Sequence, residues 1–246
     1  MNNFRTIAQQ TPLVVKNIII INVLMFVLSF VFSLKNINLN QLLGLYYIGS
    51  SNFRPFQVVT HMFMHGGLTH IFFNMYALWM FGRVLESVWG PKRFFIFYFV
   101  TGIGAAILHM LAMHVEFMSL ASDMDARSVH MVLREGADVI SRGQNYTDSA
   151  LAQLNLLLCT PTVGASGAVF GVLLGFGMLF PNTQLMLIIP PMPIKAKYFV
   201  MIYGALELFL GFTNSGGNVA HFAHVGGMIF GYFMIRHWNK RSNTFY

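Results

Sequence analysis

Six long apolar segments follow one another along the chain, separated by polar or glycine-rich breaks. They cover residues 17–33, 68–83, 94–115, 167–180, 198–212 and 220–238. A helix needs roughly 20 mostly apolar residues to cross the hydrocarbon core of a bilayer, and these segments approach or reach that length. Because a helix satisfies its own backbone polar groups, apolar segments in lipid fold as helices. The pattern therefore predicts six transmembrane helices.

The stretches between these segments differ in character. Residues 36–60 interleave aromatic and polar side chains, which is typical of a loop at the membrane interface. Residues 116–150 hold most of the acidic residues and no long apolar run, so we expect an extramembrane insertion, with a surface helix over 126–140. Residues 185–193 are apolar but short and interrupted by prolines, which predicts a connector on the membrane surface.

The composition supports a membrane protein. Of the 246 residues, 56% are hydrophobic and 9% are charged, and the mean hydropathy is +0.61. A soluble domain carries about 25% charged residues, so charges this sparse cannot cover a water-facing surface. The single cysteine, Cys159, excludes an internal disulfide framework and a multi-cysteine metal site. The expected fold class is an all-α polytopic membrane protein, with one domain over residues 1–246.

The positions of lysine and arginine predict the orientation. With both termini inside, the inner segments hold ten basic residues: Arg5, Lys16, Arg83, Lys92, Arg93, Lys195, Lys197, Arg236, Lys240 and Arg241. The outer segments hold five over a longer stretch of sequence: Lys35, Arg54, Arg127, Arg134 and Arg142. Because basic residues favour the cytoplasmic side, we expect both termini in the cytoplasm and residues 116–150 outside. The net charge of +7 then reflects topology, and no nucleic-acid partner is expected.

The first apolar segment also fits a signal peptide in length. No small-x-small cleavage site follows it, however, and further apolar segments come after it, so we interpret it as a retained helix. The short termini and the lack of a convincing transit peptide favour a multi-pass protein of a bacterial plasma (inner) membrane.

Strongly polar groups at membrane depth are costly and are candidates for function. Ser166 stands in Gly164-Ala165-Ser166-Gly167, where a loop enters a helix whose N-terminus faces outside. Free backbone N–H groups and the helix dipole at that point favour both a nucleophile and a developing oxyanion. The same four residues also fit an ordinary N-cap serine, so this motif alone is weak evidence.

His224 in the sixth segment is the candidate base. Small residues recur every fourth position near both candidates, at Gly167, Gly171 and Gly175 and at Ala223, Gly227 and Gly231. Such stripes let two helices approach closely, and if they face each other, Ser166 and His224 both lie beside the seam. Imidazole is suited to accept a serine proton near neutral pH. Plain helix packing explains the stripes equally well.

A carboxylate would normally orient such a base. Glu86 falls at the cytoplasmic end of the second segment, on the wrong side of the membrane. Glu207 is not excluded, but nothing in the sequence places it beside His224. We therefore expect a Ser–His dyad. Phe170, one helical turn after Ser166, is positioned to stack on the imidazole.

A further polar cluster comprises His61, His65, His70 and Asn74. On a helix, His70 and Asn74 would share one face, whereas the other two histidines would lie nearly opposite. The cluster has no His-Glu-x-x-His pattern and no carboxylate, so we expect no metal and no cofactor. His70 and Asn74 are better interpreted as oxyanion donors, and His61 and His65 as residues that pin the interfacial loop.

Together these residues resemble the rhomboid family of intramembrane serine proteases. The resemblance is carried by His61-Met62-Phe63-Met64-His65-Gly66-Gly67-Leu68-Thr69-His70-Ile71-Phe72-Phe73-Asn74, by Gly164-Ala165-Ser166-Gly167, and by Ala223-His224-Val225-Gly226-Gly227 with Gly231. The three motifs occur in the family's order, and the resemblance covers all six segments. Glu86 also falls where the family commonly has a glutamate.

The resemblance implies a six-transmembrane-helix bundle with an interfacial first loop. It implies that Ser166 attacks the scissile carbonyl and that His224 takes its proton. The oxyanion would be held by His70, Asn74 and the Ser166 backbone N–H, with Gly164 shaping the loop. As supporting residues we take Phe170, His65, Gly227 and Gly231.

The resemblance also implies the substrates and their route of entry. Substrates would be single-span membrane proteins with a small residue before the cut and helix-weakening residues nearby, and the membrane lipid would be the other partner. The fifth helix and a cap loop near Gly216-Gly217 would move to admit a substrate sideways from the lipid.

Two features depart from the family pattern. Many members have Trp-Arg near the end of the first loop, where this chain has Phe56-Gln57 with Arg54 upstream, so the anchoring of the loop stays open. The insertion at 116–150 is unusually long and acidic, and it fits either substrate recruitment or a tolerated surface insertion.

Two other classes of function compete with the protease. A non-catalytic relative that binds or escorts membrane proteins would usually have lost the serine or the histidine, and both are present. A transporter or channel would show paired charges across several segments or inverted repeats. Glu207 is the one acidic residue inside a segment, and the basic residues Arg83 and Arg236 fall at the cytoplasmic ends of theirs, which favours the protease.

Overall fold

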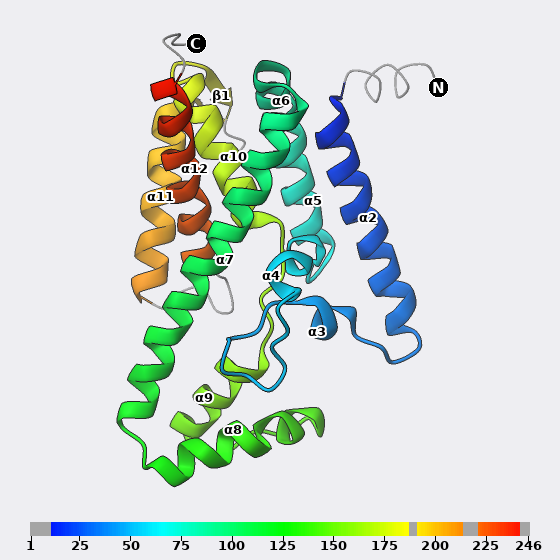
Figure 1. Cartoon of the computed structure of the whole chain (residues 1–246), viewed down its shortest axis with the longest axis vertical. Coiled ribbons are helices and arrows are strands. Elements are labelled where there is room, and N and C mark those ends of the chain that lie inside the picture. The colour runs from blue at the N-terminus through cyan, green and yellow to red at the C-terminus, as the bar shows by residue number, and fades with distance from the viewer. Residues whose placement is uncertain (1–10, 187–190, 214–220, 242–246) are drawn as a thin grey trace.

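The computed structural model describes residues 11–186, 191–213 and 221–241, and helices dominate them. The main bundle consists of α2 (Leu13–Ser33), α5 (Leu68–Ala77) continued by the π-helical segment η2 (Leu78–Gly82) and α6 (Arg83–Trp89), α7 (Pro91–Ser122), α10 (Ser166–Leu179), α11 (Ala196–Thr213) and α12 (His221–Arg241). These helices run side by side, and the beginning of α2 and the end of α12 lie at the same end of the bundle (Figure 1). This arrangement fits a helical membrane bundle.

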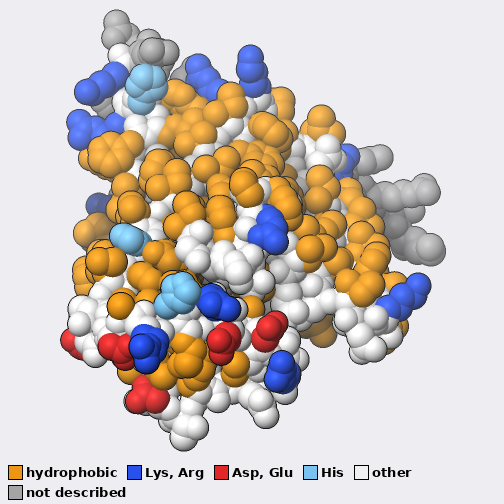
Figure 2. Space-filling view, turned by 60° about the horizontal axis from the view of Figure 1, so that its bottom comes forward, with side chains coloured by type: hydrophobic (Ala, Val, Ile, Leu, Met, Phe, Trp, Pro, Cys, Tyr) orange, Lys and Arg blue, Asp and Glu red, His pale blue; other side chains and the backbone are white. Residues whose placement is uncertain are grey.

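Three of the described helices are long and apolar enough to cross a membrane, namely α2, α7 and α11. Helix α10 is apolar but shorter, and almost all of its length is buried between its neighbours. Figure 2 shows hydrophobic side chains covering the middle of the molecule, as expected for a surface that contacts lipid. The chain is therefore a multi-pass membrane protein, and the count of six crossings remains a prediction.

The predicted outer insertion, residues 116–150, is largely helical. Helix α7 continues through Ser122, so the boundary placed at residue 116 falls inside a helix. The expected surface helix is present as α8 (Ala126–Ser141), and the sequence pattern missed a second helix, α9 (Ser149–Cys159). Each begins with an aspartate whose side chain accepts hydrogen bonds from two backbone N–H groups of the first turn, Asp125 for α8 and Asp148 for α9.

The insertion is a folded unit attached to the bundle. Helices α8 and α9 pack on each other and on the end of α7 around a small apolar cluster that includes Val132, Leu154, Leu158 and Met113. Helix α8 lies across the lower end of α7 in Figure 1, and Figure 2 shows acidic side chains gathered at this end. The insertion thus covers one end of the bundle and leaves its lipid-facing sides open.

The first loop is anchored by Gln57. Its elements are α3 (Leu39–Leu43), α4 (Gln57–Thr60) and the 3₁₀ turn η1 (His61–Phe63). The buried Gln57 side chain donates to the carbonyl oxygens of Leu42 and Asn52, at 3.3 and 3.1 Å, and accepts from the Arg54 backbone N–H at 2.9 Å. Gln57 therefore holds the loop at the place where the family pattern has Trp-Arg.

The predicted connector over residues 185–193 is flanked by β-structure. Two short strands, β1 (Gln184–Met186) and β2 (Pro193–Lys195), pair antiparallel with Leu185 opposite Ile194. Pro193 stands at the first position of β2, where the loss of a backbone donor is tolerated. The expected cap loop near Gly216-Gly217 lies outside the described residues.

The glycine stripes of α10 and α12 face each other. A Cβ at Gly227 would collide with the carbonyl oxygen of Gly167, and a Cβ at Gly231 would lie 3.5 Å from the Cα of Gly171. Only residues without a side chain allow two helix backbones this close. The seam brings the first turn of α10 against the first turns of α12.

Glu86 links α6 to the N-terminus of α2. Its carboxylate accepts hydrogen bonds from the backbone N–H groups of Val14 and Val15, at 2.9 and 2.8 Å. Helix α2 has no side-chain cap of its own at this end. The buried Glu86 of α6 therefore supplies the missing cap from another helix, in agreement with the dipole preference for negative charge.

Candidate active site

Ser166 is the first residue of α10 and follows a loop that only glycine can complete. Gly164 has φ 134°, a conformation that side chains rarely adopt. A Cβ at this position would also lie 2.8 Å from Nε2 of His70. The Gly164 backbone N–H donates to the His61 carbonyl oxygen at 3.0 Å, which ties the serine loop to the first loop.

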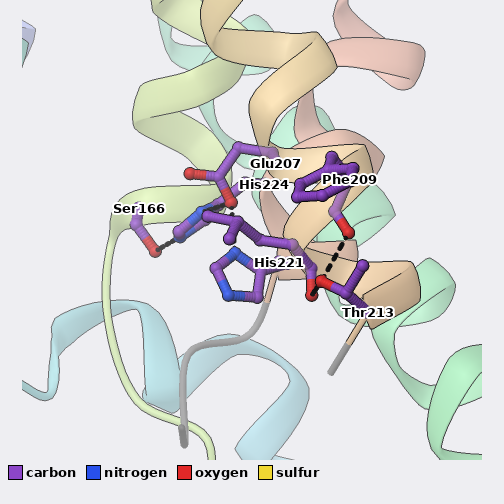
Figure 3. Close-up of polar contacts among 7 residues, drawn as sticks. Ser166, Glu207, Phe209, Thr213, His221 and His224 are labelled. Atoms are coloured by element: carbon purple, nitrogen blue, oxygen red, sulfur yellow. Dashed lines mark hydrogen bonds and ion pairs between the residues drawn. The ribbon is translucent and has the colours of Figure 1, made fainter. Parts of the chain in front are cut away.

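The structure brings Ser166 and His224 into contact. The Oγ of half-buried Ser166 lies 2.8 Å from Nε2 of His224, within hydrogen-bond distance (Figure 3). The two side chains come from different helices, and the close approach of Gly167 and Gly227 sets their spacing. A serine hydroxyl facing an imidazole nitrogen is the arrangement that activates serine as a nucleophile.

The imidazole of His224 is held on its flat side by Phe170. The ring centroids are 4.2 Å apart and the planes differ by 6°. Phe170 is stacked in turn by Tyr203 of α11, with centroids 5.4 Å apart. This stack fixes the plane of the histidine ring, as the position of Phe170 one turn after Ser166 predicted.

The structure adds a carboxylate that the sequence did not place. Oε2 of Glu207 on α11 lies 2.9 Å from Nδ1 of His224 and 2.7 Å from Nδ1 of His221 (Figure 3). All three side chains are buried. The sequence left Glu207 open as a partner of His224, and the structure places its carboxylate within hydrogen-bond distance of that histidine, whereas the Ser–His dyad stays a prediction. A charged residue inside an apolar segment and a second histidine three residues before His224 were the signals available in the sequence.

His70 lies on the other side of the serine loop. Its Nε2 and the Oγ of Ser166 both flank Gly164, because a Cβ placed there would be 2.8 Å from the first and 3.5 Å from the second. Its Nδ1 accepts from the Gly66 backbone N–H at 3.4 Å. Nδ2 of buried Asn74 donates to the His70 carbonyl oxygen at 3.1 Å, which engages one of its two N–H groups.

The remaining two histidines of that cluster have different surroundings. Nδ1 of His61 bonds the Gln57 carbonyl oxygen at 2.8 Å, and burial lowers the pKa of His61 to about 4. His65 is buried with its ring edge-on to His70, centroids 5.1 Å apart, and its ring nitrogens have no hydrogen-bond partner among the described residues. Both side chains therefore pack within the first loop. Neither has a hydrogen bond or ring contact with Ser166 or His224 among the described residues.

A possible metal site falls at a different place from the histidine cluster considered above. The ligand atoms of Glu207, His221 and His224 lie within 4.8 Å of one another, close enough to surround a divalent cation. The two nitrogen-to-oxygen distances of 2.7 and 2.9 Å are those of hydrogen bonds. The Glu207 carboxylate therefore accepts one hydrogen bond from each histidine.

Comparisons with known proteins agree on one family. The Rhomboid domain family matches residues 52–238. The mitochondrial Rhomboid protein 1 of Saccharomyces cerevisiae is 25% identical over 174 residues, which are 71% of this chain and 39% of that protein. Rhomboid protease AarA of Providencia stuartii is 25% identical over 193 residues, covering 74% and 57%, and Rhomboid protease GluP of Bacillus subtilis is 24% identical over 177 residues, covering 72% and 25%. The chain thus spans less than two thirds of the length of each of these relatives.

Proposed function

The chain belongs to the rhomboid family, and we propose that it is an intramembrane serine endopeptidase with Ser166 as nucleophile and His224 as general base. The observation that carries this proposal is the 2.8 Å contact between Oγ of Ser166 and Nε2 of His224. Relatives named as rhomboid proteases support the same activity. Retention of both side chains argues against the alternative of a non-catalytic protein that escorts membrane proteins.

The first half of the proposed reaction forms an acyl-enzyme. Oγ of Ser166 bonds to the scissile carbonyl carbon while its proton passes to Nε2 of His224. Collapse of the tetrahedral intermediate breaks the carbon–nitrogen bond, and the same proton goes from Nε2 to the departing amine. The second half repeats these steps with water as the nucleophile, and it releases the carboxylic acid and restores the serine.

The negative oxygen of the intermediate needs donors beside Ser166. The N-terminus of α10 offers the Ser166 backbone N–H, which is free of intrahelical partners at this position. Nε2 of His70 flanks the Gly164 loop, and Asn74 retains a second N–H on Nδ2. We assign these three groups to the oxyanion, because preorganised donors at this position are a major contribution to catalysis.

The proposed substrates are single-span membrane proteins cleaved within or beside the bilayer. The placement of the site among apolar helices supports this class, because a substrate helix would reach it from lipid. We propose six membrane crossings, with both termini in the cytoplasm of a cell whose plasma (inner) membrane holds the protein. The name of the yeast relative places that protein in mitochondria, so fractionation of the native host is the direct test of location.

The activity is tested by cleavage of a single-span substrate in liposomes. Wild type should cut, and Ser166→Ala and His224→Ala should not, at equal abundance and with unchanged thermal unfolding. Equal cleavage by the variants would refute the assignment of Ser166 and His224. If the wild type cuts none of several substrates, a fluorophosphonate probe decides the matter, because labelling of wild type and not of Ser166→Ala supports an active serine. Absence of labelling would favour the escort function.

A further inference from the structure

We propose that Glu207 is a positioning residue for the histidine base, so that this chain works with a Ser166–His224–Glu207 triad, and that His221 holds the carboxylate in place. The inference rests on the proposed function, because it concerns the same base. It goes beyond the Ser–His dyad expected from the sequence.

Two hydrogen bonds join the three side chains in the order acid, base and nucleophile. Glu207 Oε2 lies 2.9 Å from Nδ1 of His224, and Nε2 on the opposite side of the same ring lies 2.8 Å from Ser166 Oγ. The carboxylate and the serine are thus bonded to the two different nitrogens of one imidazole, as Figure 3 shows. This is the order in which a carboxylate orients a histidine that serves a serine.

The contact decides which tautomer of His224 is present. A carboxylate oxygen only accepts hydrogen bonds, so Nδ1 must carry the proton that it donates to Glu207. In the neutral ring, Nε2 then holds the lone pair, and that lone pair faces the Ser166 hydroxyl. Without Glu207, the proton is free to sit on Nε2, and a ring in that form cannot accept a proton from serine.

His221 gives Glu207 its second partner. Its Nδ1 donates to the same Oε2 at 2.7 Å, and the two histidines lie three residues apart on one face of α12. A buried carboxylate is costly unless its charge is compensated by hydrogen bonds. His221 thus lowers the cost of keeping a charged Glu207 next to His224 and limits its choice of rotamer.

The triad depends on the packing of α11 against α12. Glu207 comes from α11, which packs against α12 and α10 and exposes many large apolar side chains on its other side. Any displacement of α11 that admits a substrate would withdraw the carboxylate from His224. The complete triad therefore exists only while α11 lies against α12.

A purely structural role is the competing explanation, since Glu207 also ties α11 to α12. The two roles predict different kinetics. A tether would change the folded fraction or the entry of substrate, and therefore KM. A positioning residue changes kcat and the reactivity of Ser166 toward a small fluorophosphonate probe, which needs no substrate helix.

The test compares Glu207→Gln, Glu207→Asp and His221→Phe with wild type in the full chain. For Glu207→Gln we expect kcat to fall by about 10²- to 10⁴-fold, as for removal of the acid in other serine proteases, with KM changed less than about threefold. Fluorophosphonate labelling should slow in parallel. Glu207→Asp should recover part of the loss, and His221→Phe should lower kcat by roughly tenfold.

A matched control is Glu86→Gln, which also neutralises a buried glutamate that accepts two N–H groups. It should lower the unfolding temperature and leave the kcat of the folded protein near that of wild type. NMR of protein with ¹⁵N-labelled histidine gives a direct readout. Wild type should show two strongly downfield Nδ1–H resonances, His221→Phe one, and Glu207→Gln neither.

Several outcomes would overturn the inference. Wild-type kcat and labelling in folded Glu207→Gln would show that the carboxylate does not position the base. Loss of activity on chelation, restored by Zn²⁺, would show that the three side chains hold a cation instead. Failure of the proposed function is distinguishable, because it appears as unchanged cleavage by Ser166→Ala whatever Glu207 does.

Discussion

The ring of Phe170 lies parallel to the imidazole of His224, with centroids 4.2 Å apart and an interplanar angle of 6°. Hydrogen bonds hold this imidazole by its two nitrogens, and Phe170 holds it by its face. These contacts therefore oppose a rotation of the imidazole that would turn Nε2 away from Ser166.

Removing this aromatic face should reduce catalysis without unfolding the protein. For Phe170→Leu we expect kcat to fall by about fivefold, because a stacking contact contributes about 1 kcal/mol to holding the ring. Cleavage of a single-span substrate in liposomes measures it. Phe176→Leu, which alters the packing of the same helix against Phe81, is the control and should change stability more than kcat. Equal effects on kcat would count against the stacking role.

The oxyanion assignment predicts a loss confined to the chemical step. His70→Ala and Asn74→Ala should each lower kcat by about 10²- to 10³-fold and leave KM within a small factor, as expected when one donor to the oxyanion is removed. Steady-state kinetics on the same substrate checks this. Variants with a raised KM and normal kcat would place these side chains in substrate binding instead.

The seam between α10 and α12 predicts a large effect of one added methyl group. In Gly227→Ala, the new Cβ would overlap the carbonyl oxygen of Gly167, so the helices must move apart. We expect a loss of about 1–3 kcal/mol of stability and a disproportionate loss of cleavage, because Ser166 and His224 separate. Thermal unfolding in detergent and cleavage are measured together. Gly67→Ala, with no atom within 4 Å of the added Cβ, is the stability control and should unfold as wild type does.

The burial of His61 predicts acid sensitivity. Burial lowers its pKa to about 4 from the ordinary 6.5, so the unfolded chain binds a proton that the folded chain does not. Stability contributed by this group is therefore full above pH 6.5 and falls by about 3 kcal/mol as the pH drops from 6.5 to 4. His61→Gln should flatten the dependence of the unfolding temperature on pH over that range. His130→Gln on the exposed face of α8 is the control. The prediction would be contradicted if the unfolding temperature of His61→Gln depended on pH as steeply as that of wild type.

Much of the helical framework follows from local sequence. Apolar runs fix where helices form, and the predicted segments at 167–180 and 198–212 differ from α10 and α11 by only a few residues. Helix α9 was missed because its run of apolar residues, which includes Leu156 and Leu158, is too short to be distinguished from the end of a loop. The β1–β2 pair was missed because Pro193 obscures a strand of three residues.

Some residues could be identified from the sequence, whereas the roles of others could not. Ser166, His224, His70 and Asn74 could be chosen because each is a polar group in an apolar setting or forms part of a motif. The roles of Gln57 in the first loop and of Glu86 at the start of α2 could not, because their partners lie elsewhere in the chain, up to 72 residues away for Glu86.

By itself, the sequence determined that the chain is a helical membrane protein and which polar residues its helices must bury, because these properties depend on composition and on short-range periodicity. It also determined that α10 and α12 carry glycine stripes able to meet. Only the tertiary structure decided that Glu207 reaches both His221 and His224. The rotation and depth of α11 against α12 set those distances, and they result from the packing of the whole bundle, which no local pattern encodes.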